Sequence, residues 1–388
     1  MQIKIRTSAL KDVINKAIKI STNDKMLPLT SFLFMKAKND TLSVMCTDAT
    51  NYFEISTECA TTDDFEVTVK GTMFSKIVSK ITTEFITLEL GSTKGESRTS
   101  LILNGNGKYT IELPTNEEGL LIKYPNYADM KDIVETGAIK VSDIKNIITS
   151  NKPTLATNDI DKVRKYYYCG NLVASCNENG VGCVNKTSMF KTPVLIPSNV
   201  MDILSIFTSE TINYEYDGIS MMFTNDNMKL YIKVGKDIEH YPVERLSEFA
   251  NVSMDSSCTV AKSAIVSAID RLSIFISPYD IYGVYLSFTK DGLSIASSNE
   301  SATELIGYHE SENFQPFRCL LRADEFRNIV SGRNGEALNI CYGDSSFVKF
   351  VDNKTVHILG TISETVEDEY TEDSEDEYYD SDSEDYEE

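Results

Sequence analysis

The spacing of apolar residues along the chain predicts six amphipathic helices. In residues 8–20, Leu10, Val13, Ile14, Ala17 and Ile18 recur at i, i+3, i+4, i+7 and i+8, which places them on one face of an α-helix. Five further segments have the same kind of spacing, and each of the six follows a short strand-like run. The predicted helices are residues 8–20, 72–81, 142–152, 198–208, 262–273 and 323–334.

Alternating, strand-like segments separate these helices. A similar sequence motif, the recurring phrase, occurs three times, as TLSVMCTD (41–48), NLVASCNE (171–178) and GLSIASSNE (292–300). The segment TSLILNGNGKYTIEL (99–113) has an Asn-Gly turn between two alternating runs, which is typical of a β-hairpin. The last strands alternate in the same way over SSFVKFVDNKTVHILG (345–360).

One unit of strands and helices is therefore repeated three times along the chain. Each unit is itself doubled, because it contains two helices that are each followed by strands. We predict an α+β fold of three tandem domains, each a duplicated unit of helix plus antiparallel sheet. The predicted domains are residues 1–133, 134–252 and 253–363, and an acidic tail follows at 364–388.

The net charge of −22 is distributed unevenly. Residues 364–388 contain fifteen acids and no Lys or Arg, so we expect this tail to be disordered. The six predicted helices contain eleven Lys or Arg against six Asp or Glu. Their outer faces form a basic surface in an acidic protein, which favours contact with phosphate. The alternative is that these faces are only solvated, as charged helix faces usually are.

Several functions are not expected from this sequence. The eight cysteines include no CxxC pair and the three histidines are far apart, so we expect no metal and no cofactor. The GxxxxGK[ST], HExxH and GxSxG motifs are missing, so we do not expect an enzyme. No apolar run is long enough for a membrane span and no signal peptide is visible, so we expect a cytoplasmic protein.

The ordered series of motifs resembles a known family over about 360 residues. MLPLTSFLFMKAKNDTLSVMCTDATNYFEI (26–55), KYYYCGNLVASCNENGVGCV (165–184) and SPYDIYGVYLSFTKDGLSIASSNE (277–300) carry the resemblance. Together they resemble the sliding clamp of bacterial replication, the beta subunit of DNA polymerase III. The resemblance implies a head-to-tail homodimeric ring around double-stranded DNA of any sequence, which tethers a DNA polymerase and meets a clamp loader. The divergence and the tail would suit a clamp encoded by a phage.

Basic residues of the helices are the first candidates for DNA binding: Lys11, Lys16, Lys19, Lys76, Lys80, Lys145, Lys152, Arg271 and Arg327. The resemblance adds residues of two loops: Lys25, Lys162, Arg164, Lys165, Tyr166 and Tyr167. For the two tyrosines the alternative is packing within a sheet, because three successive tyrosines cannot all be buried on one face.

The resemblance also implies a pocket for partner peptides between the second and third domains. By position we expect its wall to include Tyr168, Leu172, Val184, Asn185, Lys186, Thr187, Ser188, Met189, Pro242, Leu246, Ser346, Ile358 and Leu359. The usual Thr-Asp-Gly-His-Arg-Leu run aligns here with residues 184–189, and the usual Met-Pro-Met aligns with 359–361. The specificity must therefore differ from that of the family, and the alternative is that these apolar residues form interdomain core.

Ring closure would join the first domain of one chain to the third domain of the other. The positions that align with this joint are Tyr109, Phe275 and Ile276, although all three could instead be core residues. A different function is also open, in which the tail is the working part of an acidic interaction protein, a chaperone or a DNA mimic, without a ring. That alternative does not account for the six repeated helices.

Overall fold

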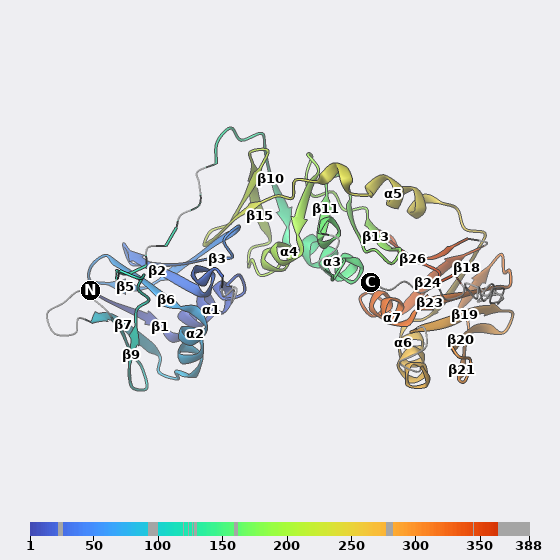
Figure 1. Cartoon of the computed structure of the whole chain (residues 1–388), viewed down its shortest axis with the longest axis horizontal. Helices are drawn as coiled ribbons and strands as arrows, with labels where there is room; N and C mark the ends of the chain where they lie inside the picture. The colour runs from blue at the N-terminus through green and yellow to red at the C-terminus, as the bar shows by residue number, and fades with distance from the viewer. Residues whose placement is uncertain are drawn as a thin grey trace, which may run out of the picture.

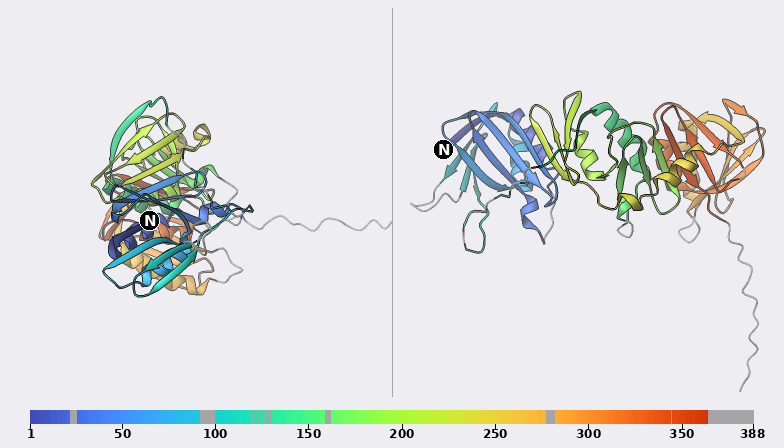
Figure 2. Two further views of the ribbon diagram at one scale, coloured as in Figure 1. Left: turned by 90° about the vertical axis from the view of Figure 1, so that its left-hand side faces the viewer. Right: turned by 90° about the horizontal axis from the view of Figure 1, so that it is seen from above.

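The computed structural model describes residues 1–21, 26–91, 100–118, 120–122, 124–125, 127, 130–158, 162–276, 282–343 and 345–363. The chain forms an arch of three units that follow one another in a row (Figures 1 and 2). Each unit repeats the same order of strands and two helices. The predicted α+β repeat is therefore present in the fold.

The first unit contains β1 (Gln2–Arg6), α1 (Thr7–Ala17), β2 (Phe32–Lys38), β3 (Thr41–Thr47), β4 (Tyr52–Glu58), β5 (Ala60–Thr61), β6 (Phe65–Lys70), α2 (Gly71–Lys80), β7 (Phe85–Gly91), β8 (Ser100–Asn104) and β9 (Lys108–Glu112). The second contains β10 (Glu135–Lys140), α3 (Val141–Asn151), β11 (Tyr166–Cys169), β12 (Val173–Cys176), β13 (Val181–Asn185), β14 (Val194–Pro197), α4 (Ser198–Leu204), β15 (Thr211–Tyr216), β16 (Ser220–Thr224) and β17 (Met228–Lys233). The third contains β18 (Ser256–Ala261), α6 (Lys262–Leu272), β19 (Gly283–Thr289), β20 (Gly292–Ser297), β21 (Thr303–Ile306), β22 (Glu310–Glu312), β23 (Phe317–Arg322), α7 (Ala323–Ser331), β24 (Ala337–Tyr342), β25 (Phe347–Val351) and β26 (Thr355–Gly360).

The six predicted helices all form, and their starts agree with the prediction to within one residue. In α1 the apolar stripe is buried as expected, with Leu10, Ile14 and Ala17 at 1% exposure or less. One helix was missed, α5 (Val243–Asn251), which connects the second unit to the third. It lies outside the repeat and begins directly after Pro242, and Leu246 is the one residue that it buries among those the structure describes.

The units are joined by β-ladders rather than by loops alone. At the first junction β17 pairs with β4, and Leu230 lies opposite Phe53 in an eight-stranded sheet. At the second junction β26 pairs with β13, and Leu359 lies opposite Val181 in a nine-stranded sheet. In both junctions the last strand of one unit pairs with the corresponding strand of the unit before it. The equivalent strands that remain, β9 and β21, are end strands of the other two sheets.

A buried polar network fixes the second junction on its helix side. Nε2 of His357 lies 2.7 Å from the Ser150 carbonyl, and Nδ1 lies 2.8 Å from Nη1 of Arg333. Because a guanidinium can only donate, Nδ1 accepts and Nε2 carries the proton that is donated to Ser150. Arg333 also pairs with Asp352 at 3.1 Å. Burial, followed by the charge of Arg333, lowers the pKa of His357 to about 4, so this imidazole stays neutral.

The described cysteines are free thiols, and the described helices are too short or too polar to span a membrane. All eight cysteines lie in the described part of the chain and all are free thiols. Burial raises the pKa of Cys258 and Cys319 to about 12, which makes these thiols unreactive. No helix in the described ranges is long and apolar enough to cross a membrane.

Candidate DNA channel and partner-binding cavity

The six repeated helices lie toward the opening of the arch, and the sheets form its outer side (Figure 1). The repeat explains this arrangement, because every helix packs its apolar stripe on the same side of its sheet. Lys76, Lys80 and Lys145 project from these helices and Lys19 from the turn that follows α1, and all four side chains are exposed. No ion pair with another described residue involves any of these four lysines. Their charges are available for an external anion such as phosphate.

Five of the other predicted DNA contacts are engaged within the chain. Nζ of Lys11 donates to the Ile81 carbonyl at 2.7 Å and thereby joins α1 to the end of α2. The remaining four form ion pairs, which are Lys16 with Asp12, Lys152 with Asp202, Arg271 with Glu304 and Arg327 with Asp270. These five cations are therefore engaged within the chain, and their contact with DNA stays a prediction. Sequence spacing placed them outside the apolar stripe, but it could not show Asp202, Glu304 and Asp270, which approach from other elements.

The loop residues predicted to contact DNA differ in their exposure. Lys25 lies outside the described residues. Lys162 is exposed, and Lys165 is half-buried at the end of a short 3₁₀ helix, Val163–Lys165. Tyr167 is fully buried in the core, so its assignment to DNA is wrong. Tyr166 is half-buried against the apolar cluster at the second junction, and its carbonyl accepts a hydrogen bond from Tyr241 at 3.3 Å, so its contact with DNA stays a prediction.

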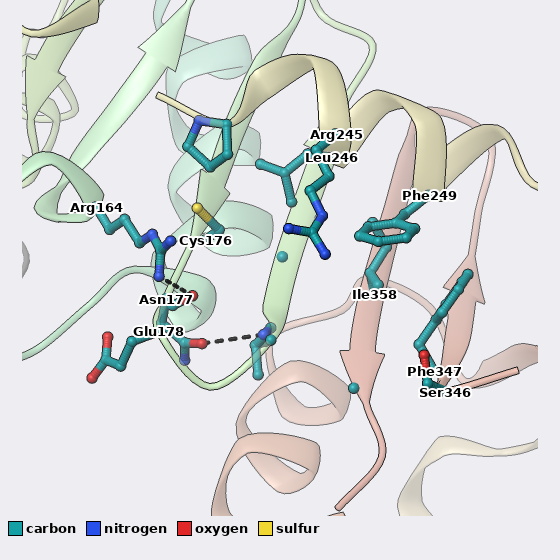
Figure 3. Close-up of a pocket in the computed structure, with 15 residues that line it drawn as sticks. Arg164, Cys176, Asn177, Glu178, Arg245, Leu246, Phe249, Ser346, Phe347 and Ile358 are labelled. Carbon is teal, nitrogen blue, oxygen red and sulfur yellow. Dashed lines mark hydrogen bonds between the residues drawn. The ribbon is translucent and has the colours of Figure 1, made fainter. Parts of the chain in front are cut away.

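A cavity of about 360 Å³ lies at the second junction, under α5 (Figure 3). Four of the predicted pocket residues line it: Pro242, Leu246, Ser346 and Ile358. Tyr168 lines a neighbouring hollow on the other side of Pro242. The junction of the second and third units, where the sequence predicted a pocket, therefore holds a cavity lined by both apolar and polar residues.

The other predicted wall residues lie elsewhere, and the alignment of 184–189 with the pocket is wrong. Val184 and Leu172 belong to the junction core, Met189 to the core of the first two units, and Leu359 to that of the third. Thr187 and Asn185 line a separate polar hollow beside Arg333. Lys186 and Ser188 are exposed beyond the end of β13. Alternate residues of a strand point to opposite faces, so a shifted alignment selects the wrong side chains.

The wall comes instead from the turn between β12 and β13, which sequence reasoning missed. Asn177, Glu178 and Gly180 line the cavity there. The Asn177 side chain accepts from the amides of Asn179 and Val181 at 2.9 and 3.1 Å, which closes the turn. The repeated phrase NLVASCNE ends in this turn, so aligning the three phrases would have located it.

The same turn is held by one residue of its own unit and by one residue of the third unit. Nη1 of Arg164 donates to the Asn177 carbonyl at 3.3 Å (Figure 3). From α7, the carboxylate of Glu325 accepts from the side-chain amides of Asn177 and Asn179 at 3.0 and 2.7 Å. Burial raises the pKa of Glu325, and these hydrogen bonds oppose that shift. Arg164 therefore acts at the cavity, although the sequence assigned it to DNA.

Helix α5 forms the roof of the cavity and is held at its end by Lys349. Nζ of Lys349 donates to the carbonyls of Ala250 and Val252, which would otherwise lack partners at the helix terminus. Phe249 packs against Phe347 with ring centroids 5.2 Å apart. Below the roof, a Cβ at Gly182 would lie 2.6 Å from Cδ2 of Leu246, so a larger residue there would displace the Leu246 side chain.

The cavity combines an apolar floor with two guanidinium groups at its rim. Ile358 and Leu246 provide the floor, and Arg164 and Arg245 stand at the rim. Such an arrangement suits an apolar side chain of a peptide whose neighbouring residues are polar or acidic.

The predicted joint residues differ in exposure. Tyr109 on β9 is 38% exposed, and Phe275 is 52% exposed after α6. Ile276 is only 8% exposed and belongs to the core of the third unit, so its assignment to a joint is wrong. Ile274 is 79% exposed in the same 3₁₀ turn (Ser273–Phe275), and it replaces Ile276 as the candidate.

Comparison with known proteins agrees with the fold. Residues 1–125 match the sequence family described as "DNA polymerase III beta subunit, N-terminal domain". No curated protein matches the sequence significantly. The matched family is a non-enzymatic processivity factor, which agrees with the expectation that this chain is not an enzyme.

Solved clamps are similar over nearly the whole chain. The DNA polymerase sliding clamp of Bacillus subtilis aligns with a TM-score of 0.79 at 13% identity, covering 94% of this chain and 99% of that one. DNA polymerase III subunit beta of Borrelia burgdorferi aligns at 0.80 and 15%, with the same coverage. The beta chain of Streptococcus pneumoniae aligns at 0.81 and 13%, covering 93% and 99%. The chain therefore has the fold of full-length sliding clamps.

Proposed function

We propose that this protein is a DNA sliding clamp, a processivity factor that encircles duplex DNA in the bacterial cytoplasm. The observation that carries the proposal is the helix-lined opening of the arch with its four lysines that form no ion pair in the described part of the chain, Lys19, Lys76, Lys80 and Lys145. Contacts between lysines and phosphates hold DNA without reading its sequence. Lys162 is a further candidate contact, because it is exposed.

Ring closure would repeat the junction that the chain already uses twice. At both internal junctions the last strand of a unit pairs with the strand after the recurring phrase of the preceding unit. The equivalent strands at the two ends of the arch are β9 and β21, which are both end strands of their sheets. Pairing β21 of one chain with β9 of another would give a nine-stranded sheet like that of the second junction. Two such joints close a homodimer.

Apolar side chains near these edges support the same joint. Tyr109 lies on β9, and Leu305 on β21 is 60% exposed. Ile274 and Phe275 are exposed at the end of α6. Exposed apolar residues that gather at an unpaired sheet edge are typical of an interface and would be an aggregation risk in a monomer.

The cavity at the second junction would tether partners. A replicative DNA polymerase and a clamp loader would each insert an apolar side chain of a short peptide above Ile358 and Leu246. The ring would then keep the polymerase on DNA by topology, while the DNA contacts stay weak enough for sliding. Because the wall lacks the usual run of the family, it would select partner peptides of its own host or phage.

Native mass and retention on DNA test the proposal. A ring predicts a particle of twice 43.4 kDa and a central hole by electron microscopy. After loading, it should remain on a nicked circular plasmid and leave when the plasmid is made linear. A monomer that binds basic proteins but is not retained on circular DNA would instead favour an acidic interaction protein.

A further inference from the structure

The first two units share an aromatic site on the sheet face away from the helices. In the first, Phe34 of β2 lies opposite Thr68 of β6, and its ring stacks on Tyr124 with centroids 5.7 Å apart. In the second, Tyr168 of β11 lies opposite Leu195 of β14, and its ring packs on Tyr241 at 5.8 Å. Both Tyr124 and Tyr241 come from the segment that follows the last strand of the unit.

The third unit contains the same site. Tyr285 of β19 lies opposite Leu320 of β23, and Leu320, like Thr68 and Leu195, stands three residues before a helix begins. Tyr285 lines a pocket of about 580 Å³, together with Phe317, Ile362 and the ion-paired side chains of Arg318 and Glu300. The Arg318 guanidinium lies 4.0 Å from the centroid of the Tyr285 ring. The pocket can accept one more flat ring beside a cation, which is a favourable surrounding for tyrosine.

After the last strand of the second unit and of the third unit, the backbone makes the same hydrogen bond to its own sheet. Two residues after β17 ends, the amide of Gly235 donates to the Leu195 carbonyl at 2.9 Å. Two residues after β26 ends, the amide of Ile362 donates to the Leu320 carbonyl at 2.8 Å. From Gly235 the chain reaches Tyr241 after six more residues. The path that brings a tyrosine to Tyr168 is therefore repeated at the start of the C-terminal segment.

We propose that the acidic C-terminal segment docks on its own third unit by placing Tyr370 against Tyr285. Tyr370 is the first tyrosine after Ile362 and follows it by eight residues, a span that reaches more than about 20 Å when extended. Its acidic neighbours, Glu367 to Glu369, would share Arg318 and Arg322 with Glu300 and Glu325, the carboxylates with which these half-exposed arginines of β23 pair. Tethering gives the segment a high effective concentration at this pocket.

Docking at this pocket would keep the acidic tail away from the lysines of the channel. Fifteen acids on a free tail would compete with DNA for the lysines of the channel. Tyr285 alternates along β19 with Val284 and Leu286, which face the core beneath α6 and α7. The pocket is therefore on the face away from the helices, and an anchor there holds the acids outside the channel. The inference goes beyond the proposed function and does not depend on ring closure.

Single tryptophans test the docking, because the chain contains none. In full-length Tyr370→Trp, we expect blue-shifted emission and acrylamide quenching several-fold weaker than in the matched control Tyr386→Trp. Adding Tyr285→Ala to Tyr370→Trp should restore quenching to the control level. Where Tyr285→Ala unfolds by circular dichroism, Arg318→Ala serves instead, because that side chain is about half exposed and its loss should partly restore quenching.

Three results would overturn the inference. Equal quenching of the Tyr370→Trp and Tyr386→Trp variants would mean that the segment does not dock at this tyrosine. If the tryptophan of Tyr370→Trp stays protected from acrylamide in a folded protein that also carries Tyr285→Ala, the segment docks at another place. Protection that disappears on dilution below the dimer dissociation constant would assign the pocket to the tail of a second copy. Each result can be read whether or not the protein forms rings on DNA.

Discussion

The four channel lysines without an ion pair among the described residues allow a quantitative test of DNA binding. Changing Lys19, Lys76, Lys80 and Lys145 to Ala should cost little folding energy, because all four are exposed. Each phosphate contact contributes about 0.9 to the slope of log affinity against log salt concentration. Four contacts per chain therefore carry a slope of up to about 3.6. Between about 0.05 and 0.2 M salt, that slope corresponds to about a 100-fold change in affinity for each chain of the ring, which the variant should no longer show.

A matched control separates this effect from a general loss of positive charge. Lys152, Arg271 and Arg327 belong to the same helix set but are paired with Asp202, Glu304 and Asp270. Changing these three to Ala removes nearly as much charge, yet we expect the slope to fall by less than about 1, because their acidic partners compete with phosphate for these cations. Both variants are compared by fluorescence anisotropy on two duplexes of unrelated sequence, at four salt concentrations, with circular dichroism and native mass as checks on folding and assembly. Equal losses of slope in the two variants would refute the reasoning, as would an unchanged slope in the fourfold variant.

Three further predictions concern the joint, the second junction and the cavity. Ile274→Asp with Phe275→Ala should give monomers of unchanged thermal stability, measured by native mass and calorimetry. Ile276→Ala should instead lower the free energy of unfolding by roughly 2–5 kcal/mol, because Ile276 is core. His357 has a folded pKa of about 4, below its ordinary 6.5, so the unfolded state binds the extra proton between these values. Stability is therefore complete above pH 6.5 and falls toward pH 4 by about 3 kcal/mol, and urea unfolding of His357→Gln should lack this fall. Ser346→Trp should fill the cavity from its exposed rim and weaken binding of a partner peptide at least about 10-fold without changing the salt slope for DNA; unchanged peptide affinity by calorimetry would contradict this role for the cavity.

The repeated architecture was predictable because its signals are local. Each helix shows an apolar stripe within about eleven residues, and each follows a strand by direct chain connection. Because the pattern occurs six times, a wrongly assigned helix in one segment does not change the predicted fold. Helix α5 has no repeat to support it, although Val243, Leu246, Phe249 and Ala250 form a short apolar face that packs at the second junction.

The cavity was predictable in place but not in detail. Pro242, Leu246, Ser346 and Ile358 were named correctly, because they flank the junction of the second and third units. The wall at Asn177 to Gly180 was missed, because the register between β12, β13 and β26 decides which residues face the cavity. A register is a property of paired strands, and no single strand contains it.

The sequence by itself therefore determined the repeat, the six helices, the basic sign of their outer faces and the separation of the acids into a C-terminal block. These features depend on residues that are close to one another in the sequence. The tertiary structure alone decided which cations are free, since Asp202, Glu304 and Asp270 approach Lys152, Arg271 and Arg327 from other elements. It also decided that Ile274 is exposed and Ile276 buried, although they are two residues apart. The physical reason is that pairing and burial depend on distances between segments far apart in sequence, which only packing of the whole chain sets.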